Sequence, residues 1–259
     1  MTVMVAPAPV VVSAARGFEG VAALAAAGLH LPVGGAAPNG LTLHLDEDGW
    51  SLRDGATVAR ADFLGGRMAE RLRDARRGEG RLATALGLKK HPEPLVLDAT
   101  AGLGRDSALA AALGCHVIAC ERSPIVALLL RDALARADNG GLRDLAGRVD
   151  VRDGDARAIL AALDERPDIV LVDPMFPERG KAAKAQKEMQ LLQRLLGPDE
   201  DTEDLLAVAL EYAVHRVVVK RPPHAPPVGG KKPAFVVEGK SARYDVYVVA
   251  GAGTAPEPD

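Results

Sequence analysis

Apolar runs that end in a charged residue alternate with amphipathic stretches from residue 95 onward. The runs predict buried parallel strands at residues 95–98, 116–121, 149–152, 168–173 and 216–220. The stretches between them are long enough for crossover helices. The last two runs, 235–238 and 244–249, leave no room for a helix between them, so they should pair antiparallel. The pattern predicts an α/β domain over residues 91–250, with a parallel sheet that ends in an antiparallel hairpin.

Before residue 60 the apolar and polar pattern indicates short elements joined by turns. Apolar and polar residues alternate over 41–45, the turn signal Asp46-Glu47-Asp48-Gly49 follows, and a second strand begins at Trp50. A hairpin is therefore expected here. We predict that residues 1–60 form a small N-terminal α+β module.

Arginines dominate residues 61–90 and predict a basic helical connector. Because the net charge of the chain is −3, any surface that binds nucleic acid must be local. The candidate contacts to RNA phosphates are Arg67, Arg71, Arg77, Lys220 and Arg221. From charge alone, a solvated helix face explains the connector equally well.

Other features of the composition point to a cytoplasmic protein. No run approaches the ~20 apolar residues of a membrane span, and the N-terminus lacks the basic start of a signal peptide. Cys115 and Cys120 flank one predicted strand and should point to its opposite faces, as two separate buried thiols. No cluster of His, Cys and Asp has the spacing of a metal site, so we expect no metal. Residues 251–259 are predicted to be a disordered tail.

A glycine-broken turn between the first strand of the domain and the next helix predicts a ligand pocket. Gly102 and Gly104 allow the backbone to bend beneath a ligand, which then faces the free N–H groups of the helix. The dinucleotide pattern would place a third glycine where this chain has Ser107. Asp98 would repel a pyrophosphate but suits a ligand with an ammonium and a sulfonium. The turn thus favours S-adenosylmethionine over a nicotinamide dinucleotide.

Acidic residues also follow the next two strands. Glu121 can accept hydrogen bonds from both hydroxyls of a ribose, and the adjacent Arg122 could lie over the adenine or face solvent. Gly154, Asp155 and Ala156 follow the third strand, where the carboxylate can accept a hydrogen bond from the adenine amine. Enzymes that use NAD share the ribose contact. These acids therefore indicate a ligand with a ribose but do not distinguish S-adenosylmethionine from NAD.

The turn Asp173-Pro174-Met175-Phe176-Pro177 follows the fourth strand and carries the candidate catalytic residues. Amino methyltransferases place a short Asp/Asn-Pro-x-aromatic turn at this point. The Asp173 carboxylate and the Pro174 carbonyl can accept hydrogen bonds from an amine on a base, which orients its lone pair toward the methyl donor. Phe176 can stack on the base. Together with the antiparallel end of the sheet, the turn predicts a Rossmann-like class I methyltransferase.

Longer motifs spread over roughly residues 60–250 add a family resemblance. They include Arg77-Gly78-Glu79-Gly80, Asp98-Ala99-Thr100-Ala101-Gly102-Leu103-Gly104-Arg105-Asp106, Glu121-Arg122-Ser123-Pro124, Asp173-Pro174-Met175-Phe176-Pro177 and Val217-Val218-Val219-Lys220-Arg221-Pro222. On these motifs the chain resembles the RsmJ family of bacterial 16S ribosomal RNA guanine-N2 methyltransferases. The resemblance implies that the substrate is the exocyclic N2 of a guanine in small-subunit ribosomal RNA. It also implies cofactor contacts at Arg105, Asp106, Glu121, Arg122, Asp155, Ala156 and Asp173.

Three other functions remain open at this point. The Asp-Pro-x-Phe turn does not encode the substrate, so a methyltransferase that acts on another RNA, on DNA or on a protein amine would carry the same signature. The glycine turn and Glu121 are compatible with an NAD(P)-dependent oxidoreductase. The basic connector is compatible with a non-catalytic RNA-binding protein. We expect 16S rRNA or the small ribosomal subunit to be the partner.

Overall fold

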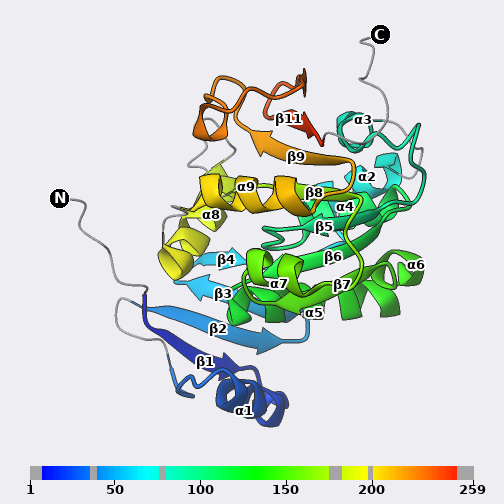
Figure 1. Ribbon diagram of the computed structural model, residues 1–259. Helices are drawn as coiled ribbons and strands as arrows, with labels where there is room; N and C mark the ends of the chain where they lie inside the picture. The colour runs from blue at the N-terminus through cyan, green and yellow to red at the C-terminus, as the bar shows by residue number, and fades with distance from the viewer. Residues whose placement is uncertain (1–7, 36–39, 76–79, 175–182, 198–200, 250–259) are drawn as a thin grey trace, which may run out of the picture.

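The computed structural model describes residues 8–35, 40–75, 80–174, 183–197 and 201–249. These residues form two sheets (Figure 1). The smaller sheet has the strand order β1-β2-β3-β4, and the larger has the order β10-β11-β9-β8-β5-β6-β7. Both the N-terminal α+β module and the parallel sheet with an antiparallel end appear as the sequence predicts.

The larger sheet positions the functional residues. Its strands are β5 (Leu95–Asp98), β6 (His116–Glu121), β7 (Val149–Asp153), β8 (Ile169–Val172), β9 (Arg216–Arg221), β10 (Phe235–Val237) and β11 (Arg243–Val248). Strands β5 to β9 run parallel, whereas β11 is antiparallel to both β9 and β10. The chain enters at the centre with β5, extends outward to β7, and then reverses to β8 on the other side of β5. A crevice therefore opens at the carboxyl ends of β5 and β8, where such folds bind ligands.

Helices cover both faces of this sheet. Those that follow β5 in the chain are α4 (Arg105–Ala112), α5 (Pro124–Asn139), α6 (Arg143–Ala146), α7 (Ala156–Ala162), α8 (Ala183–Leu196), α9 (Thr202–Tyr212) and the short 3-10 helix η1 (Val228–Gly230). One core joins the sheet to α4 and α5, and a second core joins the other face to α7 and α9. Cys115 belongs to the first core and Cys120 to the second, and both are free thiols, as predicted.

The N-terminal module packs on the helices of the larger sheet (Figure 1). It consists of β1 (Val10–Ala14), α1 (Glu19–Gly28), β2 (Leu41–Asp46), β3 (Gly49–Asp54) and β4 (Thr57–Ala59). Strands β2 and β3 form the predicted hairpin, with Leu45 opposite Trp50. The backbone N–H of Trp50 donates a hydrogen bond to Asp132 Oδ2 on α5 over 3.1 Å. Leu43 and Leu129 lie in one continuous core, so the two sheets share their hydrophobic interior.

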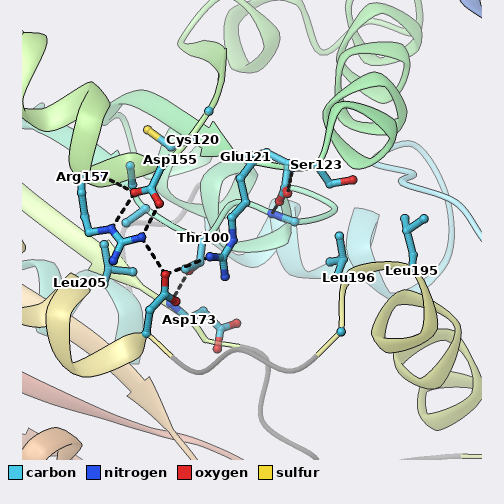
Figure 2. Close-up of a pocket in the computed structure, with 17 residues that line it drawn as sticks. Thr100, Cys120, Glu121, Ser123, Asp155, Arg157, Asp173, Leu195, Leu196 and Leu205 are labelled. Carbon is cyan, nitrogen blue, oxygen red and sulfur yellow. Dashed lines mark hydrogen bonds and ion pairs between the residues drawn. The ribbon is translucent and has the colours of Figure 1, made fainter. Parts of the chain in front are cut away.

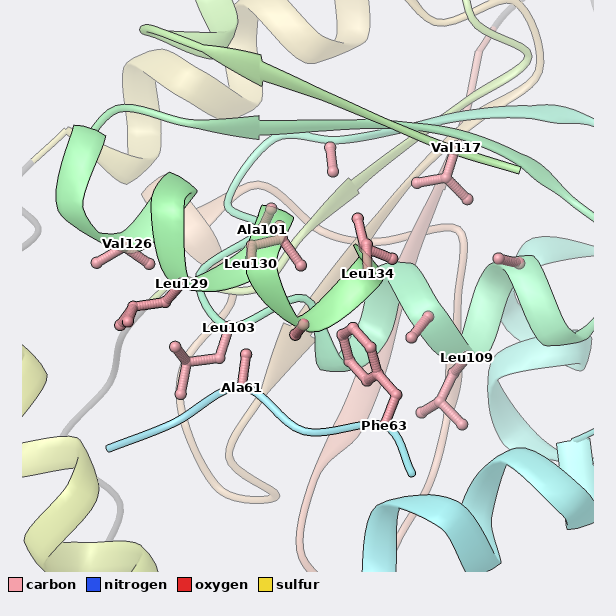
Figure 3. Packing of buried hydrophobic residues seen from close by; sticks show 14 of the residues in the cluster. Ala61, Phe63, Ala101, Leu103, Leu109, Val117, Val126, Leu129, Leu130 and Leu134 are labelled. Atoms are coloured by element: carbon pink, nitrogen blue, oxygen red, sulfur yellow. The ribbon is translucent and has the colours of Figure 1, made fainter. Parts of the chain in front are cut away.

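The connector forms α2 (Gly66–Ala75) and α3 (Arg81–Leu86), and the segment before α2 supports the glycine turn. Phe63 is buried beside Leu103 and Leu130 (Figure 3). Gly104 has a φ of 72°, and a Cβ on it would collide with Leu130 Cδ1 and lie 3.3 Å from Phe63 Cζ. Glycine is thus required at position 104 by conformation and by close packing.

Candidate active site

A hollow of about 350 Å³ lies at the carboxyl edge of the larger sheet (Figure 2). Of the residues predicted from the sequence, those that line it are Gly102, Glu121, Arg122, Gly154, Asp155, Ala156 and Asp173. They come from the ends of β5 to β8, which the topology places side by side. The remaining predicted cofactor residues, Asp98, Gly104, Arg105 and Asp106, lie around the glycine turn but not on the wall of the hollow.

Glu121 ties the glycine turn to the end of β6. Only 7% of this residue is exposed, and its two carboxylate oxygens accept hydrogen bonds from different backbone segments. The N–H of Gly102 donates to Oε2 over 2.9 Å, and the N–H of Ser123 donates to Oε1 over 2.8 Å. The carboxylate is therefore held in place before any ligand arrives.

Asp155 has a structural role as well as a place in the hollow. It caps α7, because its Oδ1 accepts a hydrogen bond from the Arg157 N–H over 2.9 Å. The Arg157 guanidinium also pairs with this carboxylate, and the hydrogen bonds from Arg157 hold the pKa of Asp155 below its usual value. Arg157 reaches Asp201 Oδ2 over 2.9 Å, and Arg122 reaches the same oxygen over 3.0 Å. These four side chains form a charged rim on the hollow.

Asp98 lies behind the glycine turn, which corrects the expectation that it faces a cationic ligand. It is 2% exposed, and Ser107 Oγ donates to its Oδ2 over 2.5 Å. The N–H of Thr100 donates to its Oδ1 over 3.2 Å. Burial raises the pKa of Asp98 to about 7. Asp98 therefore supports the turn from inside the protein. Ser107 supplies it with a hydrogen-bond donor that a glycine at position 107 would lack.

Asp173 joins a cluster of three charged groups at the other end of the hollow. Lys220 Nζ lies 2.7 Å from Asp173 Oδ2 and 2.6 Å from Asp106 Oδ2. The backbone N–H of Asp173 donates to Thr100 Oγ1 over 2.7 Å, which fixes the start of the Asp-Pro turn. Burial and the neighbouring Asp106 raise the pKa of Asp173 to about 6, although Lys220 opposes this shift. Pro174 is buried, and Phe176 lies outside the described residues.

Two basic residues predicted to contact RNA phosphates, Lys220 and Arg221, are instead engaged by groups of the protein itself. Lys220 is engaged by the two carboxylates, and Arg221 is 7% exposed and donates to the carbonyl of Pro226 over 2.5 Å. The prediction of phosphate contacts was wrong for both residues, because the sequence of β9 does not reveal that its end is covered by other parts of the protein. Arg105 is half-exposed and pairs with Glu188 of α8 over 2.6 Å.

The connector arginines remain at the surface. Arg67 and Arg71 are exposed on α2, four residues apart, while Arg77 lies outside the described residues. The charge of Arg71 contributes to lowering the pKa of Asp106. This coupling means that α2 presents a cation close to the Asp106–Lys220–Asp173 cluster.

Sequence reasoning missed several residues of the hollow. Thr100, Arg157, Asp201 and Leu205 all line it. Thr100 stands two residues after Asp98, the acidic end of β5, a position that could have been noticed. Asp201 and Leu205 come from a separate segment near the start of α9, and no local pattern links that segment to the glycine turn.

Within the described ranges, no group of three or more His, Cys, Asp or Glu side chains is arranged to hold a metal ion. No described helix is long and apolar enough to cross a membrane.

The fold and the crevice define a class I S-adenosylmethionine-dependent methyltransferase. A family model described as "Putative SAM-dependent methyltransferase" matches residues 28–249. The chain is 45% identical to the ribosomal RNA small subunit methyltransferase J of Thioalkalivibrio sulfidiphilus over 86% of this chain and 91% of that protein. It is 48% identical to the protein of the same name from Aeromonas hydrophila, over 73% of this chain and 77% of that one. The chain belongs to the ribosomal RNA small subunit methyltransferase J family.

A solved structure supports the assignment to the SAM-dependent methyltransferases. The SAM-dependent methyltransferase of Neisseria gonorrhoeae is 33% identical, with a TM-score of 0.71, over 94% of this chain and 97% of that chain. The predicted class I fold, methyltransferase activity and methyl-donor cofactor are thereby confirmed. The oxidoreductase and non-catalytic alternatives are set aside.

The residues of the hollow fit S-adenosylmethionine. Glu121 and Asp155 offer carboxylate acceptors on adjacent strands, which suit ribose hydroxyls and an exocyclic amine. Gly102 has a φ of 54°, and a Cβ there would meet only the Thr100 carbonyl oxygen, at 3.9 Å, so the turn leaves space on its open side. We infer that Glu121 and Asp155 hold the adenosine part and that Gly102 lies beneath the methionine part.

Proposed function

We propose that this protein transfers a methyl group from S-adenosylmethionine to the exocyclic N2 of a guanine in small-subunit ribosomal RNA. The observation that carries the proposal is the position of Asp173 and Pro174. Both residues directly follow β8, one strand away from the glycine turn that follows β5, and Asp173 lies on the wall of the hollow. The relatives named ribosomal RNA small subunit methyltransferase J support the choice of RNA. Such a substrate also supports action in the cytoplasm.

In methyl transfer the main task of the protein is to orient the amine. When bound, S-adenosylmethionine supplies a methyl group that its sulfonium already activates. In this proposal, Asp173 and the Pro174 carbonyl accept the two hydrogens of an exocyclic amine, which directs the nitrogen lone pair toward the methyl carbon. The carboxylate also stabilises the positive charge that develops on the nitrogen as the N–C bond forms and the S–C bond breaks. The amine proton then leaves to solvent.

The α2 arginines suit the RNA partner. Arg67 and Arg71 lie on an exposed helix face near the acceptor cluster, where they can neutralise phosphates that flank the reacting base. Phe176 is proposed to stack on that base. Lys220 and Arg221 are no longer proposed as phosphate contacts, because both are engaged within the protein.

The test uses small ribosomal subunits from a strain that lacks the gene for this protein. The purified protein is incubated with these subunits, or with the naked rRNA, and labelled S-adenosylmethionine. The rRNA is then digested to oligonucleotides, and the methylated fragments and their modified nucleosides are identified by mass spectrometry. We expect N2-methylguanosine at a single site with the wild-type chain and none with Asp173→Ala. A label on another nucleoside, or on ribosomal protein alone, would refute the proposed substrate.

A further inference from the structure

Lys220 is the only described cation in direct contact with the Asp-Pro turn, and it joins two separate segments. It stands near the end of β9, while Asp106 lies in the first turn of α4 and Asp173 follows β8. The ammonium lies 2.6 Å from Asp106 Oδ2 and 2.7 Å from Asp173 Oδ2. Both distances fall in the range of charge-assisted hydrogen bonds.

The cluster is poorly explained as a stabilising device. One ammonium faces two carboxylates, and Asp106 is only 5% exposed. Asp106 Oδ1 is buried and has no donor among the described residues. Burying such a group costs free energy, and apolar side chains of similar volume are often at least as stable in such places. An arrangement of this kind next to a reacting base points to a role in function.

We propose that Lys220 is a positioning residue for methyl transfer: by bridging Asp106 and Asp173, it holds the Asp173 side chain at the base-binding turn as an ionised acceptor. The proposal rests on the proposed function, since it assigns Asp173 to the acceptor amine. It replaces the phosphate contact that the sequence suggested for Lys220.

The charges around Asp173 explain why a cation is needed. Lys220 faces it from β9 and Asp106 from α4, while Asp98 and Tyr244 act from β5 and β11. Burial is the largest single influence on Asp106 and favours its neutral form, but the charge and hydrogen bond of Lys220, the charge of Arg71 and a hydrogen bond with Asp173 together outweigh it and lower the pKa of Asp106. Without Lys220, two neighbouring carboxyls would share a proton. A protonated Asp173 would donate a hydrogen bond where the amine requires an acceptor.

The pH dependence follows from these shifts. The pKa of Asp173 is about 6, so transfer by the wild-type protein should fall as the pH drops through that value. In Lys220→Met the pKa of Asp173 should rise by about 1–3 further units, as expected when an opposite charge is lost at this distance. The acidic limb of kcat then moves upward by the same amount. At pH 7 the smaller ionised fraction of Asp173 should lower kcat by roughly 2- to 100-fold, and the deficit should shrink as the pH rises.

The experiment compares Lys220→Met and Lys220→Arg with the wild type. A matched control is Lys90→Met, an exposed lysine near the opposite edge of the sheet. Methyl transfer to small ribosomal subunits is measured across pH, with kcat and the KM for RNA determined separately. Calorimetry with S-adenosylhomocysteine and thermal unfolding establish that each variant is folded. Asp173 itself is titrated by carbon-13 NMR of its carboxyl carbon, assigned with Asp173→Asn.

A raised Asp173 titration in Lys220→Met, with an unchanged KM and partial recovery in Lys220→Arg, would support the proposal. A raised KM for RNA with an intact kcat would indicate that Lys220 contacts RNA phosphates, and it would overturn the proposal. An unmoved Asp173 titration would overturn it too, whatever the substrate. The NMR result does not depend on turnover, so a wild-type chain that made no N2-methylguanosine would count against the proposed function alone.

Discussion

The two ends of the hollow hold their carboxylates in different ways. At the cofactor end, Glu121 accepts hydrogen bonds from the backbone N–H groups of Gly102 and Ser123. At the acceptor end, Asp173 is held by the ammonium of Lys220, which it shares with Asp106. Backbone amides do not titrate in the physiological range, whereas the acceptor cluster depends on the balance of three ionisable groups. Methyl transfer should therefore be more sensitive to charge than cofactor binding is.

The largest effect is expected for Asp173→Ala at the acceptor end. The transfer rate at saturating cofactor should fall by roughly 10³-fold, because the amine loses both its orientation and the compensating charge. The affinity for S-adenosylhomocysteine should change only a few-fold. Single-turnover methylation and calorimetry measure the two quantities separately. A transfer rate within tenfold of the wild type would show that Asp173 does not act on the amine.

Glu121→Gln tests the cofactor end. The amide keeps the shape but loses the charge, and its nitrogen cannot accept the hydrogen bond of a backbone N–H. We expect cofactor affinity to fall roughly 10- to 100-fold, the cost of losing hydrogen bonds to a charged group. The transfer rate at saturating cofactor should stay within a few-fold of the wild type. If the rate fell and the affinity did not, Glu121 would belong to the chemistry and the contrast between the two ends would break down.

The glycine turn supports both ends, and its two glycines should differ in their effect on stability. Gly104→Ala combines a positive φ with a collision at Leu130, so the free energy of unfolding should drop by about 3 kcal/mol. A Cβ at position 102 has space, so Gly102→Ala should lose only the free energy needed to hold alanine at a positive φ, about 1 kcal/mol. Denaturant unfolding of the two variants makes the comparison. Equal losses would mean that Leu130 gives way without cost.

Features that depend on neighbours in the sequence could be predicted, and features that depend on tertiary burial could not. The strands, the hairpin and the acidic strand ends follow from local periodicity and turn chemistry. Asp98 and Lys220 were given ligand contacts because a charged residue at a strand end looks the same whether it faces the hollow or the interior. Asp201 was missed because its segment reaches Arg157 only through the packing of α9 against α7.

The smallest effect is expected for the rim formed by Arg157 and Asp201. Their side chains remain 32% and 27% exposed, and ion pairs of that kind contribute about 0.2–1 kcal/mol. Arg157→Ala and Asp201→Asn should each change the affinity for S-adenosylhomocysteine less than about fivefold, and the double mutant should show coupling below about 1 kcal/mol. Arg152→Ala, which removes an exposed pair with Asp150 outside the hollow, is the matched control. A loss of fiftyfold at Arg157 would mean that the cofactor end also relies on charge, and the difference between the two ends would then be one of degree.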